Sequence, residues 1–291
     1  MNLHVDHYAY AGAGKGGTPL VLLHGWGMHG GMWRGVAEQM AQSFDVYAVD
    51  LPGHGFSCEK REEGKGNTST PLLPFSLDSI VEQLSSQFEE PLAVCGWSLG
   101  GHVALRWALR HPQQIKRLVL VASTPCFVQL DDWKYALSVE ILEEFAENLR
   151  HHYALTLKRF LALQVRGGDQ EREWLNVLRN SLFSRGEPDL NALQTGLGIL
   201  RECDQRAALP TVRQATLVLA GERDTLIPQQ ASQYLAERIP NGKLATIAGA
   251  AHAPFLSHPD EFVRLVMDFM SADIVDICSI EEKTTQIQLV N

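Results

Sequence analysis

Short runs of apolar residues recur along this 291-residue chain, and segments with helical periodicity separate them. A continuous apolar run of about four to eight residues is typical of a strand that is buried on both faces of a parallel sheet. Five runs fit this description clearly, and a sixth at Leu244–Ile247 is weaker. The five clear runs are Leu20–Leu23, Val46–Val49, Leu92–Cys95, Leu118–Val121 and Leu217–Ala220.

Helical segments such as Gly101–His111 and Gln230–Ile239 lie between the runs. This alternation predicts an α/β fold with a doubly wound, mostly parallel sheet, because helical crossovers join the strands of such a sheet. The alternation stops between Thr124 and Ala208, where helices are predicted and no strand is. The predicted helices, punctuated by glycine and proline, are Val139–Arg150, Tyr153–Gln164, Gln170–Ser184 and Leu190–Leu200.

The helical interruption is predicted to be a lid inserted between two core strands. We expect residues 1–123 and 209–270 to form the core, residues 124–208 the lid, and residues 271–291 a C-terminal extension. The polar segment Glu59–Pro74 is predicted to be a mobile loop. The sequence leaves open whether the extension is an unstructured tail or adds a strand or helix.

Composition and charge narrow the class of protein. Apolar residues make up 45% and charged residues 20% of the chain, as in ordinary globular proteins, and a net charge of −9 disfavours a nucleic-acid binder. No apolar stretch is long enough to cross a bilayer, and residues 1–10 lack a signal-peptide pattern. Five scattered cysteines without a C-x-x-C pair favour a reducing compartment, so we expect a cytoplasmic protein without a metal site. A monomer is the default expectation, since the sequence does not set the oligomeric state.

The strongest chemical signal is the hexapeptide Gly96-Trp97-Ser98-Leu99-Gly100-Gly101. It directly follows a predicted strand and precedes a predicted helix, which is the context of a G-x-S-x-G nucleophile elbow. The small glycines permit a tight turn that presents the Ser98 hydroxyl near the start of the helix. We therefore predict Ser98 as a nucleophile. The alternative is a glycine-rich turn with an incidental serine.

A serine nucleophile needs a base, and the base needs an acid that orients it. His252 is the predicted base, because it follows the weak strand through Gly249-Ala250-Ala251. Asp224 is the predicted acid, because it closely follows the run Leu217–Ala220; an exposed turn aspartate is the alternative. The competing residues are predicted to lie at helix ends, in the lid or at its exit, and they are His111, His151, His152, His258, Asp189 and Asp204.

The anionic intermediate needs hydrogen-bond donors that are already in place. The backbone N–H of Leu99, directly after the nucleophile, is one predicted donor. The second is the N–H of Trp26, in the loop after the first apolar run. His24 in the same loop is predicted to brace the loop rather than to act as a base.

Together these motifs resemble the α/β-hydrolase fold family, in which the triad residues follow the chain order Ser, Asp, His. The resemblance spans nearly the whole predicted core. It implies that Asp50–Gly55 is a structural turn that shapes the wall of the site. The matching segments are His24-Gly25-Trp26, Asp50–Gly55, the elbow, Gly221–Asp224 and Gly249–His252.

A closer resemblance covers roughly residues 18–270 and rests on the elbow together with Ala122–Phe127, Arg159–Gln164 and Ala250–Phe255. These segments are similar to the carboxylesterase family of biotin synthesis, which hydrolyses the methyl ester of pimeloyl-acyl-carrier protein. The polar loop and the C-terminal extension depart from that family. The resemblance implies that the substrate site is lined by Trp26, Ser98, Leu99, Phe160, Leu161, Ala162, Leu163, Gln164 and His252.

The predicted lid is basic in an acidic chain. The segment from Asn148 to Arg185 contains seven Lys and Arg residues and three Asp and Glu residues, which gives a local charge of +4. The resemblance implies that Arg159 and Arg172 dock an acyl-carrier protein; the alternative is an ordinary solvated helix face. Docking of this kind raises association rates and weakens with salt.

The sequence therefore predicts a serine carboxylesterase that works through an acyl-enzyme and needs no cofactor. Trp97, Phe160 and Leu161 are predicted walls of an apolar channel. A generic short-chain esterase, a carbon–carbon bond hydrolase, a lactonase and an aminopeptidase remain open as alternatives on the same scaffold. A slow-turnover ligand sensor is the alternative from another class. A dehalogenase is disfavoured, since its nucleophile is an aspartate where this chain has Ser98.

Overall fold

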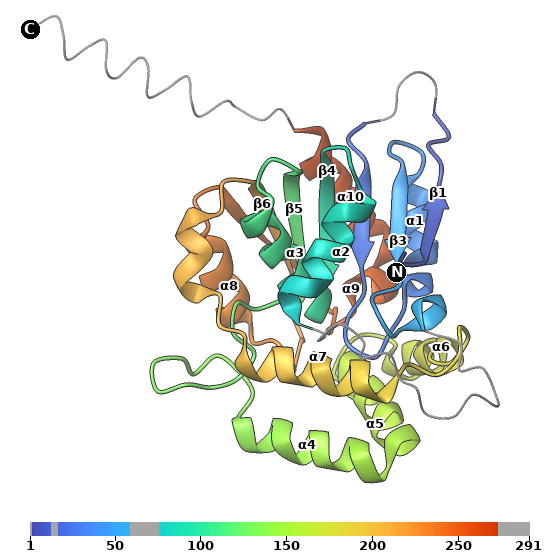
Figure 1. The fold of residues 1–291 in the computed structure, drawn as a ribbon, viewed down its shortest axis with the longest axis vertical. Coiled ribbons are helices and arrows are strands. Elements are labelled where there is room, and N and C mark those ends of the chain that lie inside the picture. Colours follow the sequence, from blue (N-terminus) through green and yellow to red (C-terminus); the bar gives the residue numbers. More distant parts are fainter. Residues whose placement is uncertain (1, 13–16, 59–75, 273–291) are drawn as a thin grey trace, which may run out of the picture.

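The structure is a computed structural model that describes residues 2–12, 17–58 and 76–272. Seven strands form one sheet in the order β1-β3-β2-β4-β5-β6-β7 (Figure 1). Every neighbouring pair is parallel except β1 and β3. The strands are β1 Val5–Tyr8, β2 Leu20–Leu23, β3 Val46–Val49, β4 Leu92–Trp97, β5 Ile115–Val121, β6 Ala215–Gly221 and β7 Gly242–Ile247.

All six predicted strands are confirmed, and most extend by a few residues beyond their apolar runs. The four side chains of β2 are completely buried, as expected for a strand covered on both faces. β1 is an additional strand that the apolar pattern does not predict. Its sequence Val5-Asp6-His7-Tyr8 contains no apolar run, because it is a half-buried edge strand that pairs only with β3.

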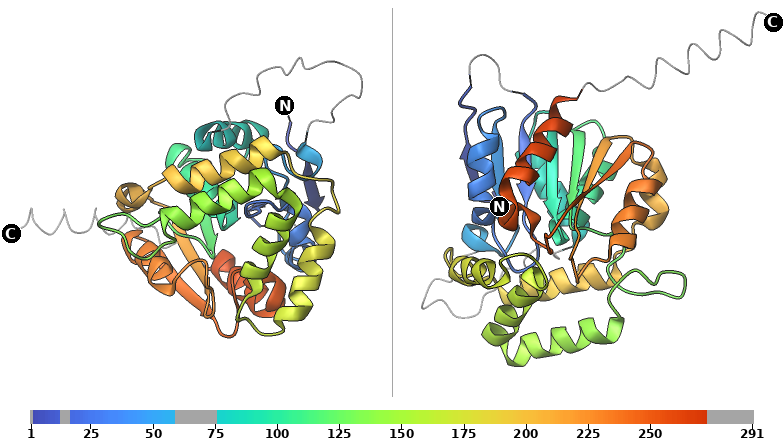
Figure 2. Two further views of the ribbon diagram at one scale, coloured as in Figure 1. Left: turned by 90° about the horizontal axis from the view of Figure 1, so that it is seen from below. Right: turned by 180° about the vertical axis from the view of Figure 1, so that it is seen from behind.

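Helices cover both faces of the sheet (Figures 1 and 2). α2 (Leu77–Gln87) and α3 (Leu99–Arg110) pack together on one face, while α1 (Arg34–Met40) and α10 (Pro259–Ser271) pack together on the other. α8 (Gln229–Arg238) joins β6 to β7, and the short α9 (Pro254–Ser257) leads into α10. Single 3-10 turns occur at Gly30–Trp33, Gly55–Ser57 and Arg206–Thr211.

Four helices lie between β5 and β6 in the chain and gather beyond the carboxyl ends of the parallel strands (Figure 1). We call them the lid helices. They are α4 (Val139–His151), α5 (Tyr153–Val165), α6 (Glu171–Ser181) and α7 (Leu190–Glu202). The predicted helix Gln170–Ser184 is too long at its C-terminus, because the chain turns after α6 and Arg185 pairs with Asp50 of the core.

The predicted loop Glu59–Pro74 lies outside the described residues, as does the C-terminal extension beyond residue 272. Within the described ranges, no helix has the length and apolar character needed to span a membrane.

Candidate active site

Ser98 stands between the end of β4 and the first residue of α3 in a conformation that few side chains adopt. Its φ is 55° and its ψ is −116°. The turn is tight: a Cβ added at Gly96 would lie 2.2 Å from the carbonyl oxygen of Gly100, and one added at Gly100 would lie 2.4 Å from that of Leu23. Only glycine fits at both positions. Backbone strain of this kind costs about 1–3 kcal/mol and is typical of active sites, so the elbow geometry predicted for Ser98 is present.

His252 and Asp224 form a buried pair at the ends of neighbouring strands. The His252 Nδ1 lies 2.8 Å from Asp224 Oδ2, and the two side chains are 1% and 2% exposed. The other carboxylate oxygen accepts the backbone N–H groups of Leu226 and Ile227 at 2.8 and 3.0 Å. Because an ionised carboxylate only accepts hydrogen bonds, this contact assigns the neutral-ring proton to Nδ1 and leaves Nε2 as a proton acceptor.

The backbone of His252 is fixed from two sides. Its carbonyl accepts the indole N–H of Trp97 at 2.8 Å, and its N–H donates to the carbonyl of Gln164 at 3.0 Å. Trp97 directly precedes Ser98, so the elbow itself holds the histidine. In the described part of the chain the Ser98 hydroxyl makes no hydrogen bond within 3.5 Å. Catalytic hydrogen bonds are often long in a protein without substrate and tighten when it binds.

The competing acids have partners of their own. Asp189 caps the start of α7 by accepting the N–H groups of Asn191 and Ala192, and Asp204 binds the guanidinium of Arg206. The competing histidine His111 ends α3 and contacts Glu82. None of these groups touches the His252–Asp224 pair.

His24 braces its loop, as predicted. It contacts the carbonyl of Gly25 through Nδ1 at 2.8 Å, and its Nε2 accepts the N–H of Leu51 at 2.9 Å. Burial lowers the pKa of His24 well below its usual range, so the ring stays neutral and both contacts persist.

The loop with the predicted second donor lies against the elbow. A Cβ added at Gly25 would lie 3.3 Å from the Cβ of Ser98. Across the described ranges no protein acceptor binds the backbone N–H of Trp26 or of Leu99. Leu99 is the first residue of α3, where an unpaired N–H and the positive end of the helix dipole favour an anion. Both predicted donors are therefore unoccupied beside Ser98.

The predicted lid segment Phe160–Gln164 lies on α5 and meets this loop. The Phe160 ring contacts the Trp26 ring edge to face, with centroids 5.0 Å apart, and the Trp26 indole donates to the carbonyl of Leu193 on α7. Ala162 and Leu163 are half-buried, whereas Leu161 is fully buried. Of the three predicted channel walls, only Phe160 keeps partial exposure, because Trp97 and Leu161 are buried.

The sequence profile of the alpha/beta hydrolase family matches residues 20–265. The chain belongs to the alpha/beta hydrolase family.

Two bacterial relatives of this hydrolase are named pimeloyl-[acyl-carrier protein] methyl ester esterase. That of Nitrosomonas europaea is 43% identical over 248 residues, which cover 85% of this chain and 93% of the relative. That of Chromobacterium violaceum is 42% identical over 271 residues, which cover 93% and 98%. An esterase from Exiguobacterium antarcticum (TM-score 0.77, 19% identity, 93% and 96% covered) and a bromoperoxidase from Bacillus anthracis (TM-score 0.78, 20% identity, 93% and 95% covered) share its fold.

The lid cations of this hydrolase fall into two groups. Arg150 pairs with Glu147, and Arg185 is a largely buried clamp on Asp50 and Asp6, so the count of +4 overstates the free positive charge. Within the described ranges the other five have no carboxylate within 4.0 Å and are exposed. They are Lys158, Arg159, Arg166, Arg172 and Arg179.

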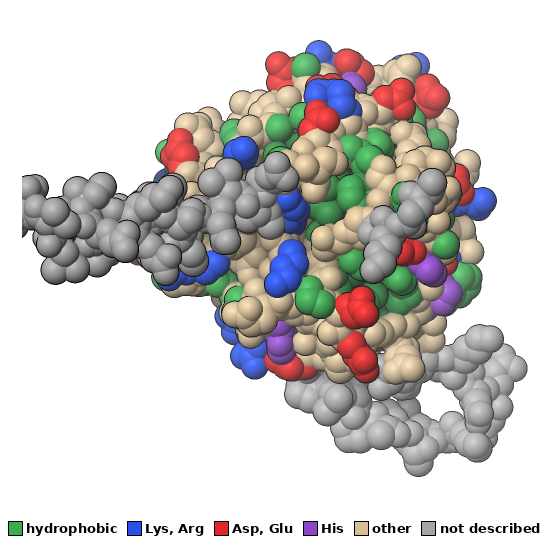
Figure 3. Space-filling model, turned by 90° about the horizontal axis from the view of Figure 1, so that it is seen from above, with side chains coloured by type: hydrophobic (Ala, Val, Ile, Leu, Met, Phe, Trp, Pro, Cys, Tyr) green, Lys and Arg blue, Asp and Glu red, His purple; other side chains and the backbone are tan. Residues whose placement is uncertain are grey.

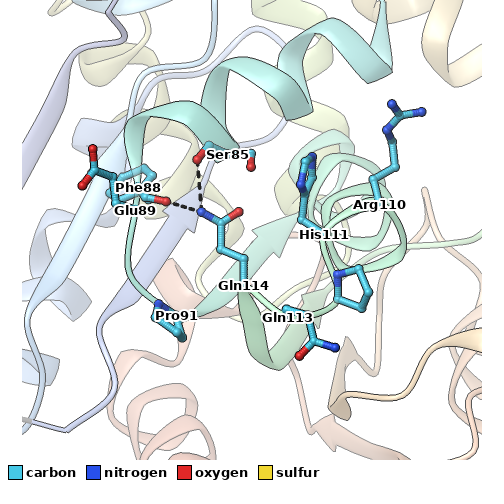
Figure 4. A pocket seen from close by; sticks show the side chains of 9 residues that line it. Ser85, Phe88, Glu89, Pro91, Arg110, His111, Gln113 and Gln114 are labelled. Carbon is cyan, nitrogen blue, oxygen red and sulfur yellow. Dashed lines mark hydrogen bonds between the residues drawn. The ribbon is translucent and has the colours of Figure 1, made fainter.

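The opposite end of the hydrolase is different. A groove of about 600 Å³ opens there beside the amino ends of β4 and β5, but Gln114 in it already donates to the carbonyls of Ser85 and Phe88 (Figure 4). Seen from that end, acidic and basic side chains are interspersed wherever the surface is described (Figure 3). The polar groups that converge lie at the carboxyl ends of the strands.

Proposed function

We propose that this hydrolase is a serine carboxylesterase that cleaves the methyl ester of pimeloyl-[acyl-carrier protein] in biotin synthesis. The observation that supports the substrate is the 42–43% identity, over most of both chains, to relatives with that name. The observation that supports the chemistry is the buried His252–Asp224 pair beside the strained elbow of Ser98.

The proposed reaction proceeds through an acyl-enzyme. Ser98 Oγ attacks the ester carbonyl while His252 Nε2 takes its proton, and Asp224 stabilises the imidazolium. The oxyanion is bound by the N–H groups of Trp26 and Leu99, and collapse expels methanol with the proton from His252. Water, deprotonated by His252, then cleaves the acyl-enzyme to release the free carboxylate and regenerate Ser98.

The lid helices supply the proposed acyl site. Phe160 is partly exposed and packs against the buried Trp26 ring, and the carbonyl of Gln164 accepts the backbone N–H of His252. An acyl chain placed there displaces water from the ester carbonyl. Lower water content strengthens each hydrogen bond to the oxyanion.

The exposed cations of α5 and α6 supply the proposed docking surface for the acidic carrier protein, with Arg159 and Arg172 as its main contacts. Because no carboxylate of the described ranges neutralises them, their positive field reaches an approaching partner. Because acyl-carrier protein bears the proposed substrate and the scattered cysteines suit a reducing compartment, we also propose a cytoplasmic location.

The test compares hydrolysis of one dicarboxylic methyl ester as the free acid and on acyl-carrier protein. We expect a large preference for the carrier form. Arg159→Glu with Arg172→Glu should lower kcat/KM for the carrier ester by about tenfold or more and leave the free ester unchanged. Arg264→Glu, on α10 and away from the lid helices, is the matched control.

Equal rates on the two substrates would reduce the proposal to a general esterase. A single turnover followed by a stalled acyl-enzyme would instead indicate a ligand sensor.

A further inference from the structure

The turn between α5 and α6 lies directly against the loop that bears His252. Asp169 N–H of the turn donates to the carbonyl of Gly249 at 2.9 Å. Just before the turn, the carbonyl of Gln164 at the end of α5 accepts the N–H of His252 at 3.0 Å. The four-residue segment from Gly249 to His252 is therefore held by the lid at both of its ends.

Gly168 makes the contact between these two bonds very close. A Cβ added at Gly168 would lie 3.0 Å from the Cβ of Ala251 and 3.3 Å from its backbone nitrogen. Ala251 directly precedes His252. Any side chain at Gly168 must therefore move either the turn or the histidine's own loop.

The guanidinium of Arg223 connects the turn to the loop that bears Asp224. Arg223, the residue before Asp224, donates to Asp169 Oδ1 at 2.7 Å and to the carbonyl of Gly167 at 3.3 Å. Its own N–H binds the carbonyl of Ala250 at 2.8 Å. The turn thus contacts both loops that support the His252–Asp224 pair.

The turn also has little freedom of its own. Gly167 has φ of 78°, and Gln170 has φ of 56°, a left-handed conformation that is uncommon for a residue with a side chain. The turn joins α5, which bears Phe160, to α6, which bears Arg172. A shift of α5 would strain the hydrogen bond from His252 to Gln164, and a shift of the turn would strain the one from Asp169 to Gly249.

We propose that the α5–α6 turn positions the proposed catalytic base, with Asp169, Arg223 and Gly168 as positioning residues. This inference rests on the proposed function, since it assigns His252 as the base. The ion pair between Asp169 and Arg223 is about half exposed and contributes little to the stability of the fold. Its role is to fix the distance from His252 to the reacting ester.

The first test is Asp169→Asn, which keeps the shape and removes the charge. With a short p-nitrophenyl ester we expect kcat to fall by about tenfold while KM stays unchanged, because a small misplacement of the base slows chemistry more than binding. Asp169→Glu should restore part of the loss. Glu143→Gln is the matched control: its pair with Arg201 is equally exposed and also lies on lid helices, yet neither residue contacts the His252 loop.

Two further variants sharpen the result. Arg223→Gln should lower kcat like Asp169→Asn, and the double variant should be no slower than either single one, because both remove the same contact. Gly168→Ala should lower kcat more than Asp169→Asn does. Gly198→Ala, which has open space around its added methyl group, should leave kcat unchanged.

Wild-type kcat in folded Asp169→Asn and Arg223→Gln would overturn the inference, as would losses that multiply in the double variant. Because the ester is small, this result does not depend on the carrier. If the proposed substrate is wrong, the enzyme should hydrolyse the free ester and the carrier ester equally well. If the proposed chemistry is wrong, Ser98→Ala should keep full activity.

Discussion

The carboxyl ends of the parallel strands meet the lid helices at Trp26 and His252. The two regions differ in how their polar groups are arranged. At the carboxyl ends of the strands the acid and the base have fixed directions: Asp224 is held by two backbone N–H groups and His252 by Asp224. On α5, on α6 and in the turn between them, five cations are exposed and have no carboxylate partner in the described ranges. The first arrangement suits chemistry that tolerates little displacement, and the second suits recognition of a partner.

The two regions are not independent. Asp169 of the turn between α5 and α6 binds the loops of both Asp224 and His252, and Gln164 near the end of α5 binds His252 itself. A partner that docks on the lid helices therefore acts on a surface that is joined by hydrogen bonds to the loop of the proposed base. The comparison predicts that variants of Asp224 or His252 affect every substrate, while variants of the exposed cations Arg159 and Arg172 affect only a carrier-bound one.

The largest effect is expected from Asp224→Asn. The amide preserves the shape but favours the wrong tautomer of His252, so kcat should fall by about 10⁴-fold. The loss should be the same for a p-nitrophenyl ester and for the carrier ester, and steady-state kinetics on both substrates measures it. A loss confined to one substrate would contradict the assignment of chemistry to the strand ends and of partner recognition to the lid helices.

A smaller effect is expected in the pH dependence of folding stability, which a buried histidine of the core should change and an exposed histidine of the lid should not. His102, in α3, is buried, and neither ring nitrogen has a hydrogen-bond partner among the described residues; burial lowers its pKa to about 4. The unfolded chain binds a proton near the ordinary histidine pKa of about 6.5, and the folded chain does not, so stability is complete above that pH and falls as the pH drops towards 4. Denaturant unfolding at pH 7 and pH 5 should show the loss.

The matched variants for this prediction are His102→Leu and His152→Gln. His102→Leu should reduce the fall in stability between pH 7 and pH 5, and the part that remains comes from other buried histidines such as His24. His152→Gln replaces an exposed lid side chain and should leave the fall unchanged. An identical pH dependence in wild type and His102→Leu would show that His102 does not cause the fall.

The sequence is most informative where a local pattern decides the structure. The apolar runs locate β2 and β3 to the residue, since a buried parallel strand needs a continuous apolar sequence. The elbow can be predicted from the sequence because the backbone around Ser98 is packed so closely that only glycine fits beside it.

Features that depend on distant parts of the chain are not readable in this way. β1 is held at the sheet edge by pairing with β3 and by the ion pair of Asp6 with Arg185, and neither contact leaves a local pattern. The pair of Asp169 with Arg223 joins residues 54 positions apart. Arg223 stands in the matched segment Gly221–Asp224, but Asp169 belongs to no motif. Only the folded structure brings the two residues together at the His252 loop.

The central claim is that one hydroxyl, that of Ser98, is activated by His252 and Asp224. The most direct measurement is covalent labelling with a fluorophosphonate, followed by mass spectrometry of the digested protein. We predict a single adduct on the peptide that contains Ser98, formed rapidly in wild type, very slowly in His252→Ala and not at all in Ser98→Ala. Labelling of another residue, or equally fast labelling of Ser98 in His252→Ala, would contradict the claim.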